Sequence, residues 1–383
     1  MLWTATTPIN IPHLETELQL YPDRAFVNYL LSGLRSGFHT GIKEVPTVTH
    51  EGNNLRTARR SPDIVTKLLQ EEVDQGFLIS PFDKSPFAVC RISPLGVVFG
   101  KYSAKPRLIL DLSWPHDDDE VSSINNLIDK DECSLTYSTI DQAIHNILLT
   151  GRDSFLCKCD IASAFKLLPI RPSLVPYYGC RWNNQFYFFV RLPFGGRSSP
   201  RIFDCLSQAL EWILCTNYRI RYCQHLLDDF LTIDSTEEEG LRTMAILTTV
   251  FKRLGVPLSM SKTIGPVTSL TYLGIVLDTS AFETRVPPEK INRILEFMQC
   301  IRLKNRCTKR ELLQLIGHFN FASRVIVPGR SFLSFLFHLA YTVKDLHIHV
   351  RISKEARIDL SMWHEFLTYL NGPQVSRWKK FFA

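Results

Sequence analysis

The sequence predicts an α+β fold, in which an antiparallel sheet is backed by helices and a largely helical region follows it. Helical periodicity alternates with short runs of β-branched and aromatic residues through positions 1–284. The segment 223–233 consists of two short apolar runs on either side of a turn, which is typical of a hairpin. From position 287 onward helical spacing predominates. With 383 residues, 45% hydrophobic and 21% charged, the chain is long enough for two or three packed units.

The first third of the chain predicts helices that give way to strands. A helix is expected near 21–37, followed by a loop at 49–62 that contains Gly and Asn. The segment 61–79 has a Ser-Pro start, apolar residues at helical spacing and a Gly near its end, so it predicts a second helix. Strands are expected at 86–92 and 106–114.

The middle of the chain continues this mixture. A helix is expected at 137–151, and a strand at 155–161 runs into a helical segment at 162–168. An aromatic-rich strand at 185–192 follows. In the helix expected at 198–214, Ser199 has the N-cap position and Pro200 the first helical position. Beyond the hairpin of 223–233, a helix at 237–255 and a second hairpin at 269–278 are expected.

Composition limits the cellular setting. No run approaches the roughly 18 consecutive apolar residues that a membrane helix needs. The N-terminal segment also lacks the basic-then-apolar pattern of a secretion signal. The protein is therefore expected to be soluble and intracellular, cytoplasmic or nuclear, with no membrane partner. Its ten cysteines have no regular spacing and are expected to be reduced thiols.

Positive charge is concentrated in one region. The whole chain carries a net charge of +6, whereas positions 285–330 contain ten Lys and Arg against three Glu, a net +7. A basic zone on predicted helices is typical of a surface that follows the phosphates of a nucleic acid. The alternative is a solvated helix face with no partner.

Two adjacent carboxylates, Asp228 and Asp229, stand at the centre of the apolar segment 223–233. Taking such a pair out of water costs several kcal/mol per ion unless a positive charge compensates. A metal ion would compensate, and the alternative is an ordinary acidic turn, in which Asp caps its own backbone. Asp160 supplies a third carboxylate, because it lies where the strand 155–161 ends. Three such aspartates can hold two divalent cations about 4 Å apart for phosphoryl transfer, and Mg²⁺ suits these hard oxygen ligands.

These residues carry a resemblance to reverse transcriptases. The segment 159–165, CDIASAF, resembles their first catalytic motif, LPFGGRSSP at 192–200 their template-side motif, and LLDDF at 226–230 their paired-aspartate signature. KPRLILDLS at 105–113 resembles the strand that holds the triphosphate, GVPLSMSK at 255–262 a motif with a terminal lysine, and YLGIVLD at 272–278 the primer grip. The six matches occur in the family's order between about 76 and 284.

Within that superfamily the sequences of these motifs are most similar to those of DIRS-type retrotransposons, which carry a tyrosine recombinase. The resemblance implies a right-hand polymerase with fingers, palm and a helical thumb. Its parts would be an N-terminal extension at 1–61, fingers at 62–120, palm at 121–168, fingers at 169–200, palm at 201–284, thumb at 285–345 and a connection at 346–383. The chain stops where the resemblance predicts a ribonuclease H domain and, further on, a recombinase, so a fragment of a longer polyprotein or a decayed genomic copy is expected.

The resemblance also implies a metal site. Asp160 and Asp228 would bridge two Mg²⁺ ions, with Mn²⁺ as an alternative, and Asp229 would complete the set. The main-chain carbonyl of Ile161 would add one ligand, since backbone oxygen suits a hard cation. Lys262 would protonate the departing pyrophosphate.

Other positions would hold the incoming dNTP. Lys105 and Arg107 would bind its triphosphate, with Lys101 as a weaker candidate, because charge accumulates on phosphate oxygens in the transition state. Phe165 would occupy the space of a ribose 2′-hydroxyl and so favour DNA synthesis. Two glycines, Gly195 and Gly196, would let the nucleotide and template approach the backbone, since glycine lacks a Cβ.

Two positions depart from the family's pattern. Leu226 stands where a tyrosine is usual, and its lost hydroxyl would weaken a contact with the primer backbone. Phe194 stands where retroviral enzymes have Gln, as in non-retroviral relatives.

The expected activity is RNA-directed DNA synthesis on an RNA or DNA template with a primer. Two alternatives stay open. One is an inactive or domesticated relic that only binds nucleic acid, and the other is a metal-dependent nuclease built on the same carboxylates.

Overall fold

The computed structural model describes residues 4–99, 106–116 and 120–369, which form two compact units. Unit 1 comprises Met1–Ser138, Cys159–Phe230 and Thr243–Thr263. Unit 2 comprises Thr139–Lys158, Leu231–Arg242 and Ile264–Ala383. The chain passes from one unit into the other within two strands and one helix, so each unit is assembled from several separate segments.

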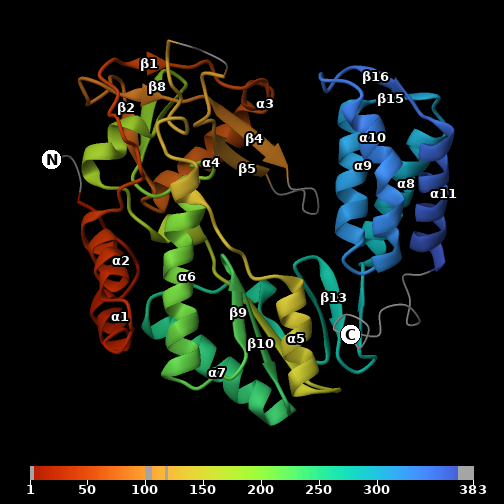
Figure 1. Ribbon diagram of the computed structural model, residues 1–383. Helices are drawn as coiled ribbons and strands as arrows, with labels where there is room; N and C mark the ends of the chain where they lie inside the picture. The colour runs from red at the N-terminus through yellow and green to blue at the C-terminus, as the bar shows by residue number, and fades with distance from the viewer. Residues whose placement is uncertain (1–3, 100–105, 117–119, 370–383) are drawn as a thin grey trace. The chain divides into compact units, whose positions relative to one another are not determined.

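Unit 1 begins with two helices that contact one another (Figure 1). Helix α2 starts where the Asp23 side chain accepts a hydrogen bond from the N–H of Phe26, and it ends at Gly37, whose φ is +86°. A third long helix, α4, starts at Pro62, as a helix-start pattern predicts. The bounds are α1 (Ile11–Glu17), α2 (Arg24–Ser36), α3 (Arg56–Arg59) and α4 (Pro62–Asp74).

A five-stranded sheet of unit 1 has the order β1-β3-β7-β8-β2. Strands β7 and β8 form an antiparallel hairpin, and β8 also pairs antiparallel with β2. A separate hairpin, β4–β5, places Val98 opposite Arg107. The bounds are β1 (His50–Glu51), β2 (Leu78–Phe82), β3 (Arg91–Ile92), β4 (Leu95–Phe99), β5 (Pro106–Leu110), β7 (Gly179–Trp182) and β8 (Gln185–Phe189).

A second sheet, of order β11-β6-β10-β9, carries the aspartates singled out above. Its strands are β6 (Phe155–Asp160), β9 (Cys223–Leu226), β10 (Asp229–Asp234) and β11 (Ile264–Val267). Helix α6 (Ser199–Thr216) packs against β9 (Figure 1), and its buried residues include Phe203, Leu206 and Leu210. Helix α7 (Glu237–Arg253) follows β10 in the chain.

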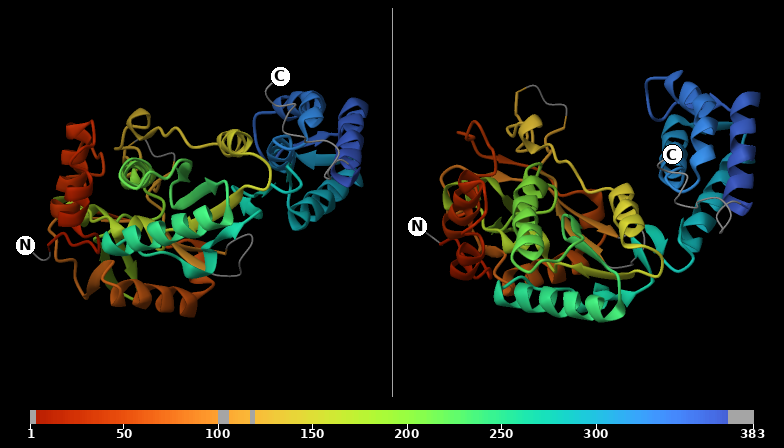
Figure 2. Two further views of the ribbon diagram at one scale, coloured as in Figure 1. Left: turned by 90° about the horizontal axis from the view of Figure 1, so that it is seen from below. Right: turned by 60° about the horizontal axis from the view of Figure 1, so that its bottom comes forward.

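Unit 2 contains the bundle of helices coloured cyan to blue in Figure 2. Helix α9 contacts α8 and α10, and α11 also contacts α8 and α10. The rings of Phe319 and Trp363 stack in its core at 4.4 Å between centroids, and Thr308 and Glu311 form a capping box at the start of α9. The bounds are α5 (Ile140–Thr150), β12 (Ser269–Tyr272), β13 (Ile275–Asp278), β14 (Glu283–Arg285), α8 (Pro288–Arg302), β15 (Arg306–Thr308), α9 (Lys309–Ala322), α10 (Ser334–Tyr341), β16 (His349–Arg351) and α11 (Lys354–Tyr369).

The α+β prediction is confirmed, with local differences. Residues 162–168 form only a 3-10 helix, η2 (Ala164–Leu167), because Ser163 adopts a left-handed conformation (φ +52°) just before it. Helix α6 starts at Ser199 itself, with Ser198 in the N-cap position. The Ser199 hydroxyl instead donates to the carbonyl of Pro193. In the ranges that the structure describes, no helix is long and apolar enough to span a bilayer.

Candidate active site

The three aspartates belong to unit 1 and lie where strands of the second sheet begin or end. Asp160 is the last residue of β6 and is only 5% exposed. Asp228 lies in the turn after β9, and Asp229 is the first residue of β10. The N–H of Ile161 donates a hydrogen bond of 2.9 Å to the carbonyl of Asp228. The backbone segments that carry Asp160 and Asp228 are therefore directly joined.

Lys262 forms an ion pair with Asp160. Its Nζ atom lies 2.9 Å from Oδ1 and 2.8 Å from Oδ2 of that carboxylate. Lys262 ends the 3-10 helix η4 (Met260–Lys262), and the preceding Ser259 donates its N–H to the carbonyl of Asp160 at 2.8 Å. The lysine side chain is 57% exposed, while that of Asp160 is 8% exposed. A solvated cation thus neutralises a buried carboxylate.

Asp228 is in a different electrostatic environment. Its pKa is raised to about 6, chiefly by burial and in smaller part by the nearby charges of Asp160 and Asp229, while a backbone hydrogen bond and Lys262 act in the opposite direction. The carboxylates are therefore close enough to repel one another.

The oxygen atoms of the three aspartates are suitable ligands for a divalent cation, although their side chains do not converge on one point. Among the described residues, no group of three His, Cys, Asp or Glu side chains is arranged to hold a metal ion. Lys262 occupies both oxygens of Asp160 instead. The groups present are carboxylate and backbone oxygens, the ligands that Mg²⁺ prefers. Their mutual repulsion at Asp228 is what a bound cation would relieve.

The turn that holds Asp228 is strained and fixed by helix α6. Leu227 has φ +53°, a left-handed conformation that costs a branched residue about 1–3 kcal/mol and persists only where surroundings hold it. The hydroxyl of Ser207 donates a 2.8 Å hydrogen bond to the Leu227 carbonyl. Leu226, which replaces the usual tyrosine, ends β9 and is partly buried.

Phe165 lies between two other aromatic rings. Its ring centroid is 5.1 Å from that of Phe194 and 5.7 Å from that of Phe203 in α6. Phe194 itself is 43% exposed. Packing on both sides fixes the orientation of the Phe165 ring, as a residue that excludes a substituent by its shape requires.

The loop with the two predicted glycines approaches other backbone closely. Gly195 has φ +99°, and a Cβ built on it would lie 2.7 Å from the carbonyl oxygen of Leu110 at the end of β5. A Cβ on Gly196 would meet the Ser199 hydroxyl at 2.6 Å. No larger residue fits the Gly195 position without a shift of the backbone.

The predicted triphosphate residues are only partly described. Arg107 lies on β5, exposed, and forms no ion pair with a residue that the structure describes. Lys101 and Lys105 lie outside the described residues.

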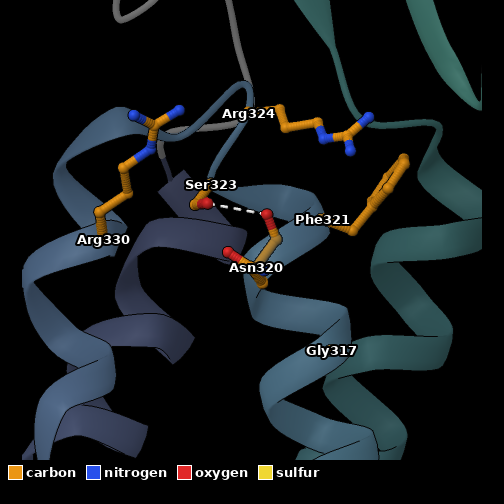
Figure 3. A pocket seen from close by; sticks show the side chains of 6 residues that line it. All are labelled: Gly317, Asn320, Phe321, Ser323, Arg324 and Arg330. Carbon is orange, nitrogen blue, oxygen red and sulfur yellow. Dashed lines mark hydrogen bonds between the residues drawn. The ribbon is translucent and has the colours of Figure 1, made fainter. Parts of the chain in front are cut away.

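The basic region of unit 2 contains a polar hollow of about 340 Å³ at the C-terminal end of α9. Gly317, Asn320, Phe321, Ser323, Arg324 and Arg330 line it. The side chains of Arg324 and Arg330 flank the end of the helix (Figure 3). Both are exposed, and neither forms an ion pair in the part of the chain that the structure describes.

Lys290 lies nearby, with Nζ 3.5 Å from the centroid of the Phe321 ring. Other charges of the region are already paired, among them Arg285 with Asp278 and Glu283.

Sequence reasoning missed the residues that support these groups. Asn125, which is 7% exposed, donates to the Gly195 carbonyl at 3.0 Å and accepts from the N–H of Arg197 at 2.8 Å. Ser207 holds Leu227 in the same way. Only their burial identifies them, because isolated Asn and Ser in a sequence most often indicate turns or solvated positions.

The fold is that of a right-hand polymerase with fingers, palm and thumb. The chain superimposes with a TM-score of 0.63 on a foamy viral protease-reverse transcriptase in complex with double-stranded DNA, at 18% identity, covering 96% of this chain and 62% of that one. A second structure of the foamy viral protein, with an RNA/DNA hybrid, gives a TM-score of 0.62 at 17% identity and covers 96% of this chain and 47% of that one.

Comparison of the sequence with protein families and curated proteins gives similar matches. Residues 117–277 match the family described as "Reverse transcriptase (RNA-dependent DNA polymerase)". Protein P of heron hepatitis B virus is 22% identical over 163 residues, 42% of this chain and 20% of that protein. The retrovirus-related Pol polyprotein from transposon opus of Drosophila melanogaster is 18% identical over 212 residues, 55% of this chain and 20% of the polyprotein. The chain thus matches about a fifth of the length of these curated relatives.

Proposed function

We propose that the chain is the polymerase core of a retrotransposon reverse transcriptase, which extends a primer by template-directed DNA synthesis. The observation that carries this proposal is the junction of Asp160 with Asp228, in which the Ile161 N–H and the Asp228 carbonyl are 2.9 Å apart within the segment that matches the reverse transcriptase family. The proposed source is a DIRS-type element, because the motif sequences described above are most similar to those of such elements. The proposed divisions are fingers at 62–120 and 169–200, palm at 121–168 and 201–284, and thumb at 285–345.

Asp160, Asp228, Asp229 and the carbonyl of Ile161 would hold two Mg²⁺ ions, or Mn²⁺ in their place. When bound, such ions stabilise charge on the attacking and leaving oxygens of a phosphoryl transfer. The raised pKa of Asp228, to about 6, supports this assignment, because it reflects carboxylates gathered in a partly buried place. Lys262 neutralises Asp160 in the free protein and would act as the proton donor to pyrophosphate.

The groups around Phe165 would select the nucleotide. A ring held between Phe194 and Phe203 would leave no space for a ribose 2′-hydroxyl, so a dNTP would bind in preference to an rNTP. Gly195 and Gly196 would let the nucleotide and template approach the loop. Arg107 would contact the triphosphate through its bidentate guanidinium, and Lys105 would add a second charge.

The proposed macromolecular partner is an RNA or DNA template with its primer. Arg324 and Arg330 at the hollow of α9 supply unpaired positive charge of the kind that binds phosphate oxygens. Gly317 also lines this hollow, and a Cβ there would meet nothing within 4 Å, so there is room beside the two arginines for a bound group. Ribonuclease H and recombinase domains in a longer element remain part of the proposal.

The test is primer extension on an oligo(dT)-primed poly(rA) template with Mg²⁺ and dTTP. Wild type is compared with Asp228→Asn, which removes one charge at nearly constant volume, and with Asp83→Asn, a matched change at an exposed position. We expect extension by wild type and Asp83→Asn and loss of at least about 100-fold in Asp228→Asn.

Two other outcomes identify the alternatives. If none of the three proteins extends the primer while all bind it with equal affinity, the chain only binds nucleic acid. Cleavage of the template by wild type without added nucleotide would indicate a nuclease instead.

A further inference from the structure

His225 is a buried residue of β9 whose two ring nitrogens both face carboxylates. Nδ1 lies 2.5 Å from Oε2 of Glu211, and Nε2 lies 3.3 Å from Oδ1 of Asp204. Both acids belong to α6, seven residues apart, so they lie two turns apart on the same face of the helix. His225 is 9% exposed and Asp204 is 4% exposed. We call this set of Asp204, Glu211 and His225 the histidine bridge.

The ring is positively charged in this position. A neutral imidazole has one donor and one acceptor nitrogen, so one nitrogen would face a carboxylate oxygen with a lone pair. An imidazolium donates from both nitrogens. Burial opposes the charge, but the hydrogen bonds to Asp204 and Glu211 outweigh it and raise the pKa of His225 to about 9.

The groups around the bridge hold the acids and the ring in place. Gln208 of α6 donates to Oδ2 of Asp204 at 2.6 Å, which leaves Oδ1 for the histidine. On the other side, the ring stacks on Phe230 of β10 at 5.5 Å between centroids. The titratable thiols nearby are Cys223, on the same strand, and Cys215, near the end of α6, and both interact with the charge of Glu211.

The bridge continues directly into the turn that carries Asp228. Leu226 and Leu227 are the only residues between His225 and that aspartate. The same helix also holds this turn, through the hydrogen bond from the Ser207 hydroxyl to the carbonyl of the left-handed Leu227. Strand β9 and the turn after it are thus attached to α6 by hydrogen bonds. The ring of His225 binds Asp204 and Glu211, and Ser207, which lies between these two acids on the helix, binds the turn.

We propose that His225 is a positioning residue, a cation held between Asp204 and Glu211 that fixes β9 on α6 and thereby sets the place of the Asp228 carboxylate. The inference rests on the proposed polymerase function for its effect on catalysis. The placement of the turn itself does not depend on that function. Buried charges of this kind add little net stability when paired, and removal of one partner leaves the others uncompensated.

The experiment compares the full-length wild type with His225→Gln, Glu211→Gln and the double variant. His225→Gln leaves two carboxylates without their cation, and the added Glu211→Gln change restores the net charge of the wild-type cluster. We expect His225→Gln to lower kcat for primer extension by between about 10-fold and 100-fold, the effect of small displacements of reacting groups. The KM for dTTP and the Kd for primer-template should change by less than about 2-fold, and the double variant should recover part of kcat. His349→Gln, at an exposed position of β16, is the matched control.

A second measurement is independent of catalysis. In amide NMR spectra, His225→Gln should shift the Leu227 and Asp228 resonances, and the His225 ring of wild type should remain protonated at pH 8. Glu211→Gln, a milder change that keeps the Asp204 contact, should shift the same amides less, which covers the case in which His225→Gln fails to fold.

Unchanged Leu227 and Asp228 resonances in both variants, or an unchanged kcat in His225→Gln beside an inactive Asp228→Asn, would overturn the inference. If the wild type extends no primer, the proposed function fails, and the amide spectra still decide whether His225 positions the turn.

Discussion

The ammonium group of Lys262 contacts both carboxylate oxygens of Asp160, at 2.9 Å and 2.8 Å, across 102 positions of sequence. The pair joins two proposed catalytic groups in the free protein. A metal ion and the lysine would therefore compete for the same oxygens, and the lysine would become available as a proton donor only after it is displaced.

Replacement of Lys262 by Met should strengthen Mg²⁺ binding in the absence of nucleic acid while slowing primer extension. Because the Lys262 side chain is 57% exposed, solvent screens its ion pair with Asp160, which is then worth about 0.2–1 kcal/mol, so the Kd for Mg²⁺ should fall by no more than about 5-fold. Isothermal titration calorimetry measures this Kd, and Lys252→Met, at an exposed position of α7, is the control. Weaker Mg²⁺ binding in Lys262→Met would mean that the lysine helps to hold the metal instead of competing with it.

Neutralisation of Asp228 should stabilise the fold at neutral pH. Its folded-state pKa of about 6 lies above the ordinary 3.8, so the folded protein holds this proton more tightly than the unfolded chain. Stability is therefore lost as pH rises between these two values, and the full cost is present above about pH 6.

Asp228→Asn should accordingly have a higher Tm than wild type at pH 7.5 without divalent ions, and the difference should shrink at pH 5. Thermal melts at the two pH values measure it, with Asp83→Asn as a control that should follow wild type at both. An Asp228→Asn protein that melts at or below the wild-type temperature at pH 7.5 would show that the carboxylates do not repel as described.

Gly195 is required for a reason beyond its backbone conformation. Both Gly195 (φ +99°) and Gly76 (φ +70°) are strained when replaced by Ala, but only at Gly195 would the new Cβ meet backbone, the Leu110 oxygen at 2.7 Å. Gly76→Ala should cost about 1 kcal/mol and keep activity. Gly195→Ala should cost more and lower primer extension by at least about 10-fold, since the loop must move. Denaturant melts and extension rates check this, and equal behaviour of the two variants would contradict it.

Replacement of Arg324 and Arg330 by Ala should weaken primer-template binding, because contacts between the arginines and phosphate groups would be lost. Each lost phosphate contact lowers the slope of log Kd against log salt by about 0.9, so the double variant should lose about 2 units of slope. Fluorescence anisotropy over a range of salt concentrations measures this slope. The control is Arg351→Ala with Lys354→Ala, two exposed residues of unit 2 away from the hollow. A slope equal to that of wild type would show that the two arginines do not contact phosphates.

The features that could be predicted from the sequence are those in which charged residues interrupt apolar segments. Asp160, Asp228 and Asp229 are recognisable because charges interrupt apolar strands, and the hairpin around them follows from period and turn alone. Helix α4 was predictable from its Ser-Pro start and helix α6 from its apolar face, although α6 begins at Ser199 and not after it.

Other features depend on contacts between distant segments. The strand expected at 86–92 shortens to Arg91–Ile92, because the Ser85 hydroxyl accepts from the N–H of Phe87 and offers that backbone a turn. The pairing of Lys262 with Asp160 and the histidine bridge join positions with no periodic relation. Asp204 gave a weak signal, since it is a charge on the buried side of α6, but a buried acid needs a partner that only the fold identifies.

The path of the chain between the two units also restricts how such a protein can change by recombination. Its crossings fall within β6, β10 and α7, besides those before α5 and β11. A breakpoint after any residue from 139 to 262 would divide both units between the two parents, and one between 160 and 228 would also separate the strands that carry Asp160 and Asp229. Positions 139–263 are therefore expected to be inherited as one block, whereas a chimaera joined at 287 exchanges the helical bundle together with the short strands β15 and β16.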